Sequence, residues 1–392
     1  MPTSDPLGIS GERFTVRYHL DGPEREARAL ATAIGIEQTV ELPEAAIPEG
    51  PIRDRLVGRL DSFKPLPSGR FEAAISYAIE LVAGELPQFL NVAYGTISLK
   101  RGVRVGGLDL PPGGFAWLRG PRFGTAGLRD LLGVPDRPLL GTVVKPIGLS
   151  AEELADLAYQ FALGGMDFIK DDSVLTDQPF APFAERVARC AEAVARAGRE
   201  TGRRCLYVPN VTAPAPLVGE RARTAKRAGA GGLMLAPGLA GWDALRTLAA
   251  DEHLGLPVVM HPAWLGPSVA HEAGGLAPSV LFGRLPRLAG ADACIFPTYG
   301  SRFSFTPEEC REIASGLRDG FGTLKPSLPI VGGGVTVERV PELCRFYGND
   351  VLLLLGGALR LRGPDLVRSC RECADLVARS ATAPGRPSPS SS

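Results

Sequence analysis

The chain has 392 residues, and its 43 lysines and arginines are balanced by 43 aspartates and glutamates. A net charge of zero argues against a nucleic-acid-binding protein, because such proteins owe most of their affinity to basic side chains that neutralise phosphates. Hydrophobic residues make up 45% and charged residues 22%, which excludes wholesale disorder. The length leaves room for one large barrel domain and a smaller partner domain.

Neither a membrane span nor a secretion signal is expected. The sequence has no run of 18 apolar residues, and its first residues lack a basic stretch followed by an apolar one. Seven cysteines are dispersed along the chain, and an odd, scattered count is typical of reduced thiols rather than of a disulfide framework. We therefore expect a cytoplasmic protein.

The first 125 residues predict a small α+β domain. Residues 13–20 alternate between apolar and polar like a half-buried strand, and residues 23–37 have helical spacing. Residues 38–44 again resemble a strand, and 70–84 mix strand and helix character. Residues 120–138, rich in glycine, proline and arginine, have the composition of a linker.

From residue 139 onward, eight apolar runs alternate with eight amphipathic helical segments. Fully apolar strands that alternate with helices indicate a parallel sheet, and eight such units in about 240 residues indicate a (β/α)8 TIM barrel. We assign residues 126–380 to this barrel and residues 381–392, which are rich in proline and serine, to a disordered tail.

In such a barrel the catalytic groups lie at the carboxyl ends of the strands. One predicted strand end reads GGMDFIKDDS, over residues 164–173. Because side chains alternate between the two faces of a strand, Lys170 and Asp172 point the same way and Asp171 points the other way. The pair is either an ion pair that closes the strand end or part of a Mg²⁺ site, since carboxylate oxygens suit that ion. A neutral lysine amine can also react with CO₂ to give a carbamate, which is an oxygen ligand.

Two stretches resemble the large subunit of ribulose-bisphosphate carboxylase (RuBisCO). GTVVKPIGLS (141–150) is similar to the family's Lys-Pro-Lys-Leu-Gly-Leu-Ser strand end, and GGMDFIKDDS is similar to its Gly-Gly-Leu-Asp-Phe-x-Lys-Asp-Asp-Glu motif. RPLLGT before the first stretch and LNVAYG (90–95) match the family as well. The family also has an α+β domain in front of an eight-fold barrel.

The resemblance implies a role for each matching residue. Lys170 corresponds to the carbamylated lysine, Asp172 to a Mg²⁺ ligand, and Lys145 to the lysine that acts in enolisation of the substrate. His261, which ends its strand, corresponds to a histidine that serves proton transfer or a substrate hydrogen bond. Asn91 corresponds to an asparagine that reaches into the active site of a neighbouring subunit, so we expect a homodimer with a shared site.

Glycines at two adjacent strand ends are expected to bind phosphate. Backbone N–H groups at such glycines can cradle the anion, and this is where barrels commonly bind phosphate. The resemblance assigns the same role to these positions, which are Gly332, Gly333, Gly334, Gly356 and Gly357.

Four departures from the family pattern bear on the reaction. Ser173 stands where the family has a glutamate ligand, and KPIGLS is one residue shorter and lacks the second lysine. HPAWL (261–265) lacks both an arginine for a second phosphate and a second histidine. YGSRFSF (299–305) lacks the lysine that stabilises the carboxylate formed from CO₂, and Arg302 is the only basic residue there, so we expect Arg302 to bind the substrate or its phosphate. The chain therefore resembles the RuBisCO-like proteins, also called form IV.

Together these residues predict Mg²⁺-assisted enolisation of a phosphorylated sugar or sugar-acid, of the isomerase, enolase or decarboxylase type, and not CO₂ fixation. Lys145 would be the base. Carbamylated Lys170, Asp172 and Ser173 would face the metal, with binding weakened by Ser173. The alternative is a regulatory or ligand-sensing protein without catalysis on the same fold. No nucleic-acid or membrane partner is expected.

Overall fold

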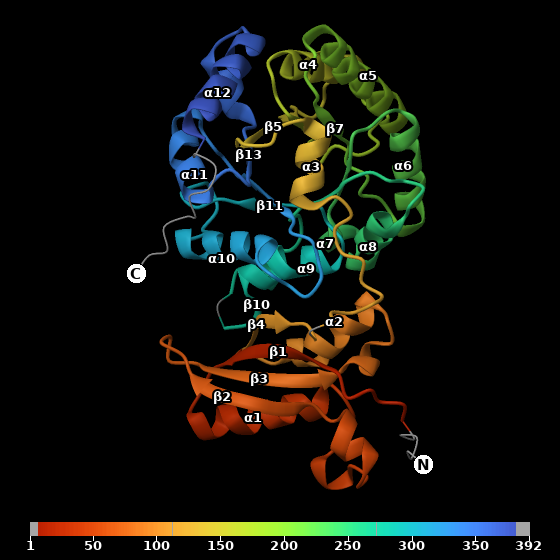
Figure 1. Ribbon diagram of the computed structural model, residues 1–392, viewed down its shortest axis with the longest axis vertical. Helices are drawn as coiled ribbons and strands as arrows, with labels where there is room; N and C mark the ends of the chain where they lie inside the picture. The colour runs from red at the N-terminus through yellow and green to blue at the C-terminus, as the bar shows by residue number, and fades with distance from the viewer. Residues whose placement is uncertain (1–6, 112, 272, 382–392) are drawn as a thin grey trace.

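A computed structural model of the chain describes residues 7–111, 113–271 and 273–381. It consists of an N-terminal α+β domain and a barrel of parallel strands surrounded by helices (Figure 1). Within these ranges, no helix is long and apolar enough to cross a bilayer. The predicted disordered tail lies outside the described residues except for Ala381, and the predicted division at residue 125 falls inside a helix, Gly124–Leu132.

The N-terminal domain is built on one five-stranded sheet. Its central strand, β1, alternates strictly between buried and half-buried residues, as the sequence predicts, and buries Phe14, Val16, Tyr18 and Leu20. Helix α1 (Glu24–Glu37) packs against the sheet, and α2 (Leu86–Tyr94) follows the third strand. The strand order is β10, β4, β1, β3, β2. The bounds are β1 (Arg13–Leu20), β2 (Arg59–Pro65), β3 (Phe71–Ala78), β4 (Val103–Asp109) and β10 (Gly275–Leu276).

The predicted strand at 38–44 is wrong. The N–H groups of Thr39, Val40 and Glu41 all donate to the carbonyl of Ile36 and close the end of α1, so they are not available to a sheet. The second strand of the domain is instead β2, an edge strand whose residues are mostly exposed and polar. Its sequence lacks the apolar alternation by which strands are recognised.

The sheet of the N-terminal domain is completed by the barrel domain. Strand β10 lies in the loop that follows the fifth barrel strand and pairs in parallel with β4. The N–H of Gly275, at a φ of 74°, also donates to the hydroxyl of Tyr94 at 2.9 Å. The two domains of one chain are therefore joined by backbone hydrogen bonds as well as by the chain itself.

Eight parallel strands form the barrel, in the order β7, β6, β5, β13, β12, β11, β9, β8. A parallel bridge between Asn210 and Met234 brings the two outer strands, β7 and β8, together. All eight predicted strands are present. Their bounds are β5 (Leu139–Val144), β6 (Phe168–Asp171), β7 (Leu206–Val208), β8 (Leu233–Leu235), β9 (Val258–Met260), β11 (Ala293–Pro297), β12 (Leu328–Gly332) and β13 (Leu352–Leu354).

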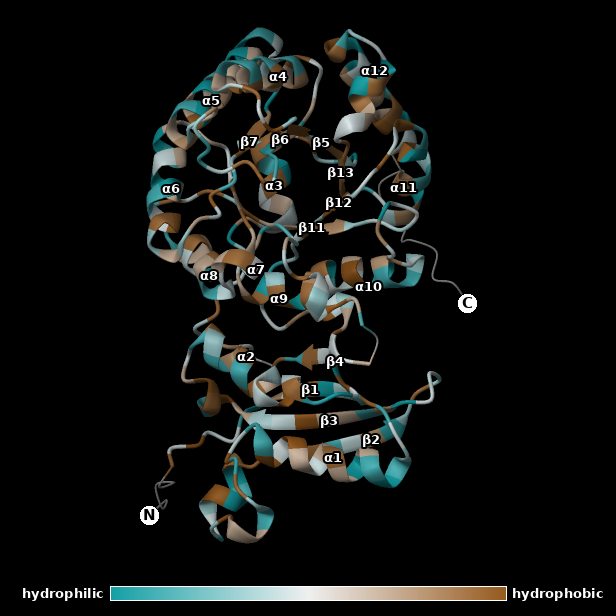
Figure 2. Cartoon of the chain, turned by 180° about the vertical axis from the view of Figure 1, so that it is seen from behind, coloured by the Kyte–Doolittle hydropathy of each residue, from teal (hydrophilic) through white to brown (hydrophobic). Residues whose placement is uncertain are grey.

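Amphipathic helices surround the strands, and Figure 2 shows apolar strands inside a ring of helices with polar outward faces. Two helices begin with a capping box, at Ser150 and at Thr306, as their sequences allow. The helices of the ring are α4 (Ala151–Leu163), α5 (Phe183–Thr201), α6 (Ala215–Arg227), α7 (Pro237–Ala240), α8 (Trp242–Ala250), α9 (Leu285–Leu288), α10 (Pro307–Arg318), α11 (Val340–Tyr347) and α12 (Leu366–Ser380).

The segment interpreted as a linker contains a helix, α3 (Gly124–Leu132), which is a second correction. Leu128 and Leu132 pack with barrel-interior residues such as Leu139, Ile330 and Leu352. Figure 1 shows α3 lying in front of the ring of strands. The helix therefore covers one end of the barrel, and the catalytic groups must be sought at the other end.

Candidate active site

The predicted catalytic residues converge at the carboxyl ends of the barrel strands. Lys145 follows β5, Lys170 lies in β6 and His261 follows β9. Electrostatic interactions link Lys170 to Lys145, Asp172 and His261. Side chains from the ends of three different strands are thus within interaction range at one end of the barrel.

Lys170 is an amine held inside the barrel. Its side chain is buried, and its strand neighbours are Val143 and Val208, whose side chains belong to the apolar interior. Its Nζ donates a hydrogen bond to the carbonyl of Asp171 at 2.8 Å. Burial, together with the charge of Lys145, lowers the pKa of Lys170 to about 8 against the opposing effect of the nearby carboxylates. A minor fraction of this amine is therefore neutral near pH 7, and the fraction grows as the pH rises through 8.

Asp172 and Ser173 continue the chain from Lys170 and are both half-buried. The Asp172 carboxylate accepts a hydrogen bond from the N–H of Val174 at 3.2 Å. The carbonyl of Ser173 accepts one from the Asn210 amide at 3.0 Å, which fixes the backbone beside its hydroxyl. The two side chains that could face a metal are thus anchored by the loop after β6.

Asp171 points away from Lys170, as the alternation of the strand predicts. Its carboxylate accepts hydrogen bonds from the Tyr207 hydroxyl (2.7 Å), the Asn210 N–H (3.0 Å) and Arg186 of α5 (3.2 Å). Asp171 and Arg186 are both fully buried, so the ion pair is shielded from water. This network joins β6, β7 and α5 and sets the position of Lys170 on the opposite face of the strand.

Sequence reasoning missed Arg186. A signal was present, because Arg186 lies three residues after Phe183 and four before Cys190, on the face of α5 that is otherwise apolar. An arginine in the buried stripe of an amphipathic helix requires a buried partner. The identity of that partner, Asp171, depends on the packing of α5 against the strands.

Lys145 lies against the glycines that follow β13. Adding a Cβ to Gly356 would bring it to within 3.0 Å of the Lys145 Nζ, so a glycine gives the amine more room at this point. A Cβ on Gly357 would meet open space. The amine of Lys145 therefore borders the predicted phosphate-binding turn on one side and Lys170 on the other.

His261 is held as a neutral imidazole. Burial lowers its pKa to about 3, and the positive charge of Lys170 contributes to the lowering. Its Nδ1 accepts a hydrogen bond from the N–H of Ala263 at 3.2 Å, which assigns the ring proton to Nε2. Of the two roles expected for His261, the site favours the neutral hydrogen-bond donor to a substrate oxygen.

The glycines after β12 form the second predicted phosphate turn. Gly333 and Gly334 have φ angles of 91° and 117°, a region that favours glycine. Phe303 packs over Gly333, and the N–H of Arg302 donates to the carbonyl of Gly333 at 3.4 Å. The Arg302 side chain itself is exposed, with its guanidinium 5.2 Å from the centre of the Phe303 ring. Arg302 thus borders this turn through its backbone.

Asn91 lies apart from these residues, on the exposed surface of α2 in the N-terminal domain. Its side chain contacts Gln88, and its carbonyl accepts hydrogen bonds from Gln38 and Gly95. These contacts are all within its own domain. The structure of one chain therefore does not bring Asn91 to the barrel site.

A Mg²⁺ ion fits this donor set only with a modified lysine. Within the described residues, no three His, Cys, Asp or Glu side chains are grouped so as to hold a metal. Asp171 is committed to Arg186 and Tyr207, which leaves Asp172 as the carboxylate beside Lys170. A carbamate on Lys170 would add a second anionic oxygen ligand, and the partly neutral amine suits that reaction. Ser173 can add a neutral oxygen.

Comparison with known proteins identifies the family. Residues 124–360 match the model of the ribulose bisphosphate carboxylase large chain, catalytic domain. The chain belongs to this family. The match contains every barrel residue discussed above, from Lys145 to Gly357.

Its relatives are RuBisCO-like proteins. The chain is 42% identical over 355 residues to ribulose bisphosphate carboxylase-like protein 1 of Rhodopseudomonas palustris, covering 91% of this chain and 95% of the relative. It is 36% identical over 376 residues to 5-methylthioribulose-1-phosphate isomerase of Rhodospirillum rubrum, covering 96% and 98%. A crystal structure of a Rubisco-like protein from Rhodopseudomonas palustris superimposes with a TM-score of 0.84 at 36% identity, over 95% of this chain and 99% of that one. These matches place the chain among the RuBisCO-like members and confirm the predicted fold.

Proposed function

We propose that the protein is an enzyme that enolises a monophosphorylated sugar, as an isomerase, and that it does not fix CO₂. The observation that carries the proposal is the position of the Lys145 amine between Lys170 and the turn at Gly356. A phosphate bound at that turn would hold a sugar with its first carbons near the amine. The name of the Rhodospirillum rubrum relative, which aligns over 96% of this chain, supports a substrate of the 5-methylthioribulose-1-phosphate type.

Two residues carry the proposed chemistry. Lys145, in its neutral form, removes the proton from the carbon next to the carbonyl. His261, neutral with its proton on Nε2, donates a hydrogen bond to the oxygen on which negative charge develops. An isomerase returns the proton to the former carbonyl carbon, and the proton of the neighbouring hydroxyl moves to the former carbonyl oxygen, so no further reactant is required.

Lys170, Asp172 and Ser173 are the residues that would hold Mg²⁺. The neutral amine of Lys170 attacks CO₂, forms a nitrogen–carbon bond and loses one proton to give the carbamate. When bound, Mg²⁺ supplies a positive charge that stabilises the enolate oxygen. Because Ser173 is neutral where the family has a carboxylate, we expect weaker metal binding than three anionic ligands would give.

CO₂ fixation lacks its supporting charges here. Arg302 is the one basic residue in the loop after β11, and its exposed guanidinium lies over Phe303. The strand end after Lys145 lacks a second lysine, and the segment after His261 lacks an arginine for a second phosphate. Each preorganised charge of this kind is worth about 3–4 kcal/mol in a transition state. A site with one phosphate turn beside Lys145 suits a monophosphate.

The protein is expected to act as a homodimer with a shared site. Eleven large apolar side chains are exposed in the described part of the chain, and six of them lie between the carboxyl end of a barrel strand and the next α-helix. Trp264 is 75% exposed there and Leu361 is 89% exposed. Apolar side chains gathered on one face mark an interface. The N-terminal domain of a second copy is the proposed cover, since it would bring the exposed Asn91 toward the barrel site.

Two measurements bear on assembly and location. Analytical ultracentrifugation of the wild-type protein should show a dimer, and Trp264→Asp should weaken its association. A wild-type protein that sediments as a monomer would refute the shared site. The seven cysteines are all unpaired, and six are buried, which supports a reducing compartment such as the cytoplasm. Thiol titration of freshly purified, unreduced protein should find all seven free.

The alternative is a ligand-sensing protein without catalysis. It would keep the phosphate turns and lose proton transfer. The neutral His261 and the lowered pKa of Lys170 count against this alternative. A protein that only binds a ligand does not need a buried amine whose pKa lies near neutral pH.

The test is product formation from 5-methylthioribulose 1-phosphate and related ketopentose monophosphates, followed by phosphorus and proton NMR. We expect an isomerised monophosphate from the wild type with Mg²⁺ and bicarbonate. Lys145→Ala should slow it by about 10²–10⁴-fold, the usual contribution of a positioned base. Lys64→Ala, at an exposed position of the N-terminal domain, is the control. Unchanged rates in Lys145→Ala would remove Lys145 as the base.

A further inference from the structure

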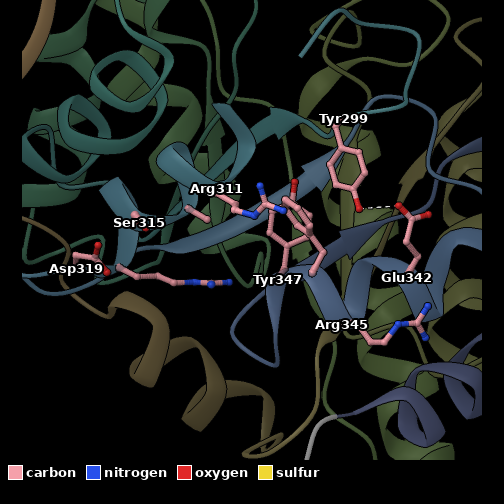
Figure 3. Close-up of a pocket in the computed structure, with 10 residues that line it drawn as sticks. Tyr299, Arg311, Ser315, Asp319, Glu342, Arg345 and Tyr347 are labelled. Atoms are coloured by element: carbon pink, nitrogen blue, oxygen red, sulfur yellow. Dashed lines mark hydrogen bonds between the residues drawn. The ribbon is translucent and has the colours of Figure 1, made fainter. Parts of the chain in front are cut away.

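A cavity of about 600 Å³ lies outside the strand barrel, between α10 and α11. Three arginines line it, together with aromatic side chains from α11 and Tyr299 from the start of the loop after β11 (Figure 3). Its volume is in the range of pockets that hold small molecules. None of the residues assigned above to catalysis lines this cavity, so it is a separate feature of the molecule. The three arginines are Arg311, Arg318 and Arg345.

Arg318 is a largely enclosed cation that forms no ion pair among the described residues, although Asp350 and Asp319 act on it through space. One of its terminal nitrogens donates to the carbonyl of Asp350, but the Asp350 carboxylate is engaged by Arg129 at 2.9 Å. The buried Nε of Arg318 has no hydrogen-bond partner within the described ranges. Burial also lowers the pKa of Arg318. An enclosed guanidinium with an unsatisfied N–H is costly unless an anion is supplied.

The other two arginines extend this positive surface. Arg311 lies over the Phe346 ring, 4.7 Å from its centre, and its ion pair with Glu308 is exposed to solvent at both ends. Arg345 makes neither a hydrogen bond nor an ion pair in the part of the chain that the structure describes. It influences Glu342 only through space, by contributing to the lowering of its pKa. Both guanidinium groups are thus available to a ligand.

The acidic residues of the cavity do not cancel this charge. Both oxygens of Glu342 are engaged, because Tyr299 donates to one at 2.6 Å and Arg339 donates to both at 3.1 Å. Figure 3 shows Tyr299 and Glu342 meeting at the edge of the cavity. Asp319 is exposed at the end of α10. The interior therefore presents guanidinium groups and aromatic faces.

Tyr299 connects the cavity to the loop of the active site. Arg339 donates hydrogen bonds to the carbonyls of Tyr299 and Gly300 and also pairs with Glu342. Further along this loop, the Arg302 N–H bonds to Gly333, and Phe303 packs over the same glycine. A ligand that contacts Tyr299 thus touches the first residues of the segment that borders the phosphate turn.

We propose that this cavity binds a phosphate-bearing small molecule other than the substrate, through Arg311, Arg318 and Arg345, and that its occupancy alters the loop 299–305. Guanidinium groups bind phosphate oxygens with paired hydrogen bonds, which the arginines lining the cavity can supply. The aromatic faces suit the organic part of such a ligand. Phosphate binding in this cavity does not depend on the proposed isomerase function. An effect of the bound ligand on the rate of isomerisation rests on that function.

Arginine footprinting with inorganic phosphate tests the binding directly. Phenylglyoxal modification of the intact protein is followed by peptide mass spectrometry, with chloride at equal ionic strength as the reference. At a phosphate concentration about ten times its Kd, modification of Arg311 and Arg345 should slow about tenfold. Arg223, an exposed arginine of α6, is the internal control and should not change. Equal modification rates for Arg311 and Arg345 with and without phosphate would overturn the proposal.

Hydrogen exchange tests the connection to the loop. In the wild type, phosphate should slow amide exchange in residues 299–305. In the double variant Arg311→Gln/Arg345→Gln, the part of this slowing that arises from phosphate in the cavity should be lost. Both positions are at the surface of the cavity, so this variant should fold even if Arg318 variants do not. Arg223→Gln should behave as wild type. An identical phosphate effect in the double variant would place its origin at the strand-end turns and refute the coupling, whether or not the protein is an isomerase.

Discussion

Replacing Lys170 by methionine should stabilise the protein while removing its activity. Lys170 is buried, and burial lowers its pKa from 10.5 to about 8. That difference corresponds to about 3 kcal/mol by which the folded state disfavours the charged amine. Methionine is similar in length and suits the apolar neighbours Val143 and Val208. It loses the hydrogen bond to the Asp171 carbonyl, worth about 1 kcal/mol, so the expected net gain at pH 7 is about 2 kcal/mol.

The pH dependence distinguishes this explanation from simple repacking. Below pH 8 the amine is charged in both the folded and the unfolded chain, so its full cost is present. Between about 8 and 10.5 the folded chain binds fewer protons than the unfolded chain, and wild-type stability rises with pH. The advantage of Lys170→Met should therefore be largest near pH 7 and should shrink toward pH 10.5.

Urea unfolding at several pH values, in CO₂-free buffer so that no carbamate forms, measures the difference in free energy of unfolding. The matched control is Lys325→Met, because Lys325 also donates its Nζ to a main-chain carbonyl but is exposed. It should give no stabilisation. A Lys170→Met protein that is less stable than wild type at pH 7, or whose advantage does not change with pH, would refute the reasoning.

Three further predictions concern the surroundings of Lys170. Calorimetry should show bicarbonate-dependent Mg²⁺ binding that strengthens as pH rises through about 8, because only the neutral amine reacts with CO₂; binding that ignores bicarbonate would argue against the carbamate. Ser173→Glu should tighten Mg²⁺ binding by about tenfold or more, since it adds an anionic ligand, whereas Ser173→Gln should not. Equal Mg²⁺ affinities of Ser173→Glu and wild type would mean that residue 173 does not face the metal. Arg186→Met should destabilise the fold by about 3–5 kcal/mol in urea unfolding, because it leaves the Asp171 carboxylate buried and unpaired. Adding Asp171→Asn to the same chain should recover part of the loss. If Arg186→Met alone were as stable as wild type, the ion pair would have no supporting role.

The barrel could be predicted because its signal is local. Each buried parallel strand is an apolar run, and each helix carries a polar face, so eight repeats identify the architecture. The edge strand β2 is mostly polar, and β10 has only two residues, so neither has a pattern of its own. Helix α3 was not predicted because glycines flank it at both ends. Its leucines can be recognised as buried only once the barrel interior against which they pack is known.

Part of the candidate site could also be predicted from the sequence. The alternation of β6 predicts that Lys170 and Asp171 point to opposite faces, because it depends only on strand geometry, and that Asp172 shares the face of Lys170 stays a prediction. The pKa values of Lys170 and His261 depend on burial and on each other, which no local pattern contains. Asn91 is named by resemblance alone, and within one chain it remains remote from the barrel site.

The proposed function depends on Lys145 removing a proton next to a carbonyl. The most direct measurement follows the loss of the substrate's exchangeable carbon-bound proton in D₂O by proton NMR, with 5-methylthioribulose 1-phosphate as substrate, because exchange is visible even where no product accumulates. The account predicts deuterium incorporation at that carbon by the wild-type protein and by Lys64→Ala, and none above background in Lys145→Ala. Exchange that persists at the wild-type rate in Lys145→Ala would contradict it.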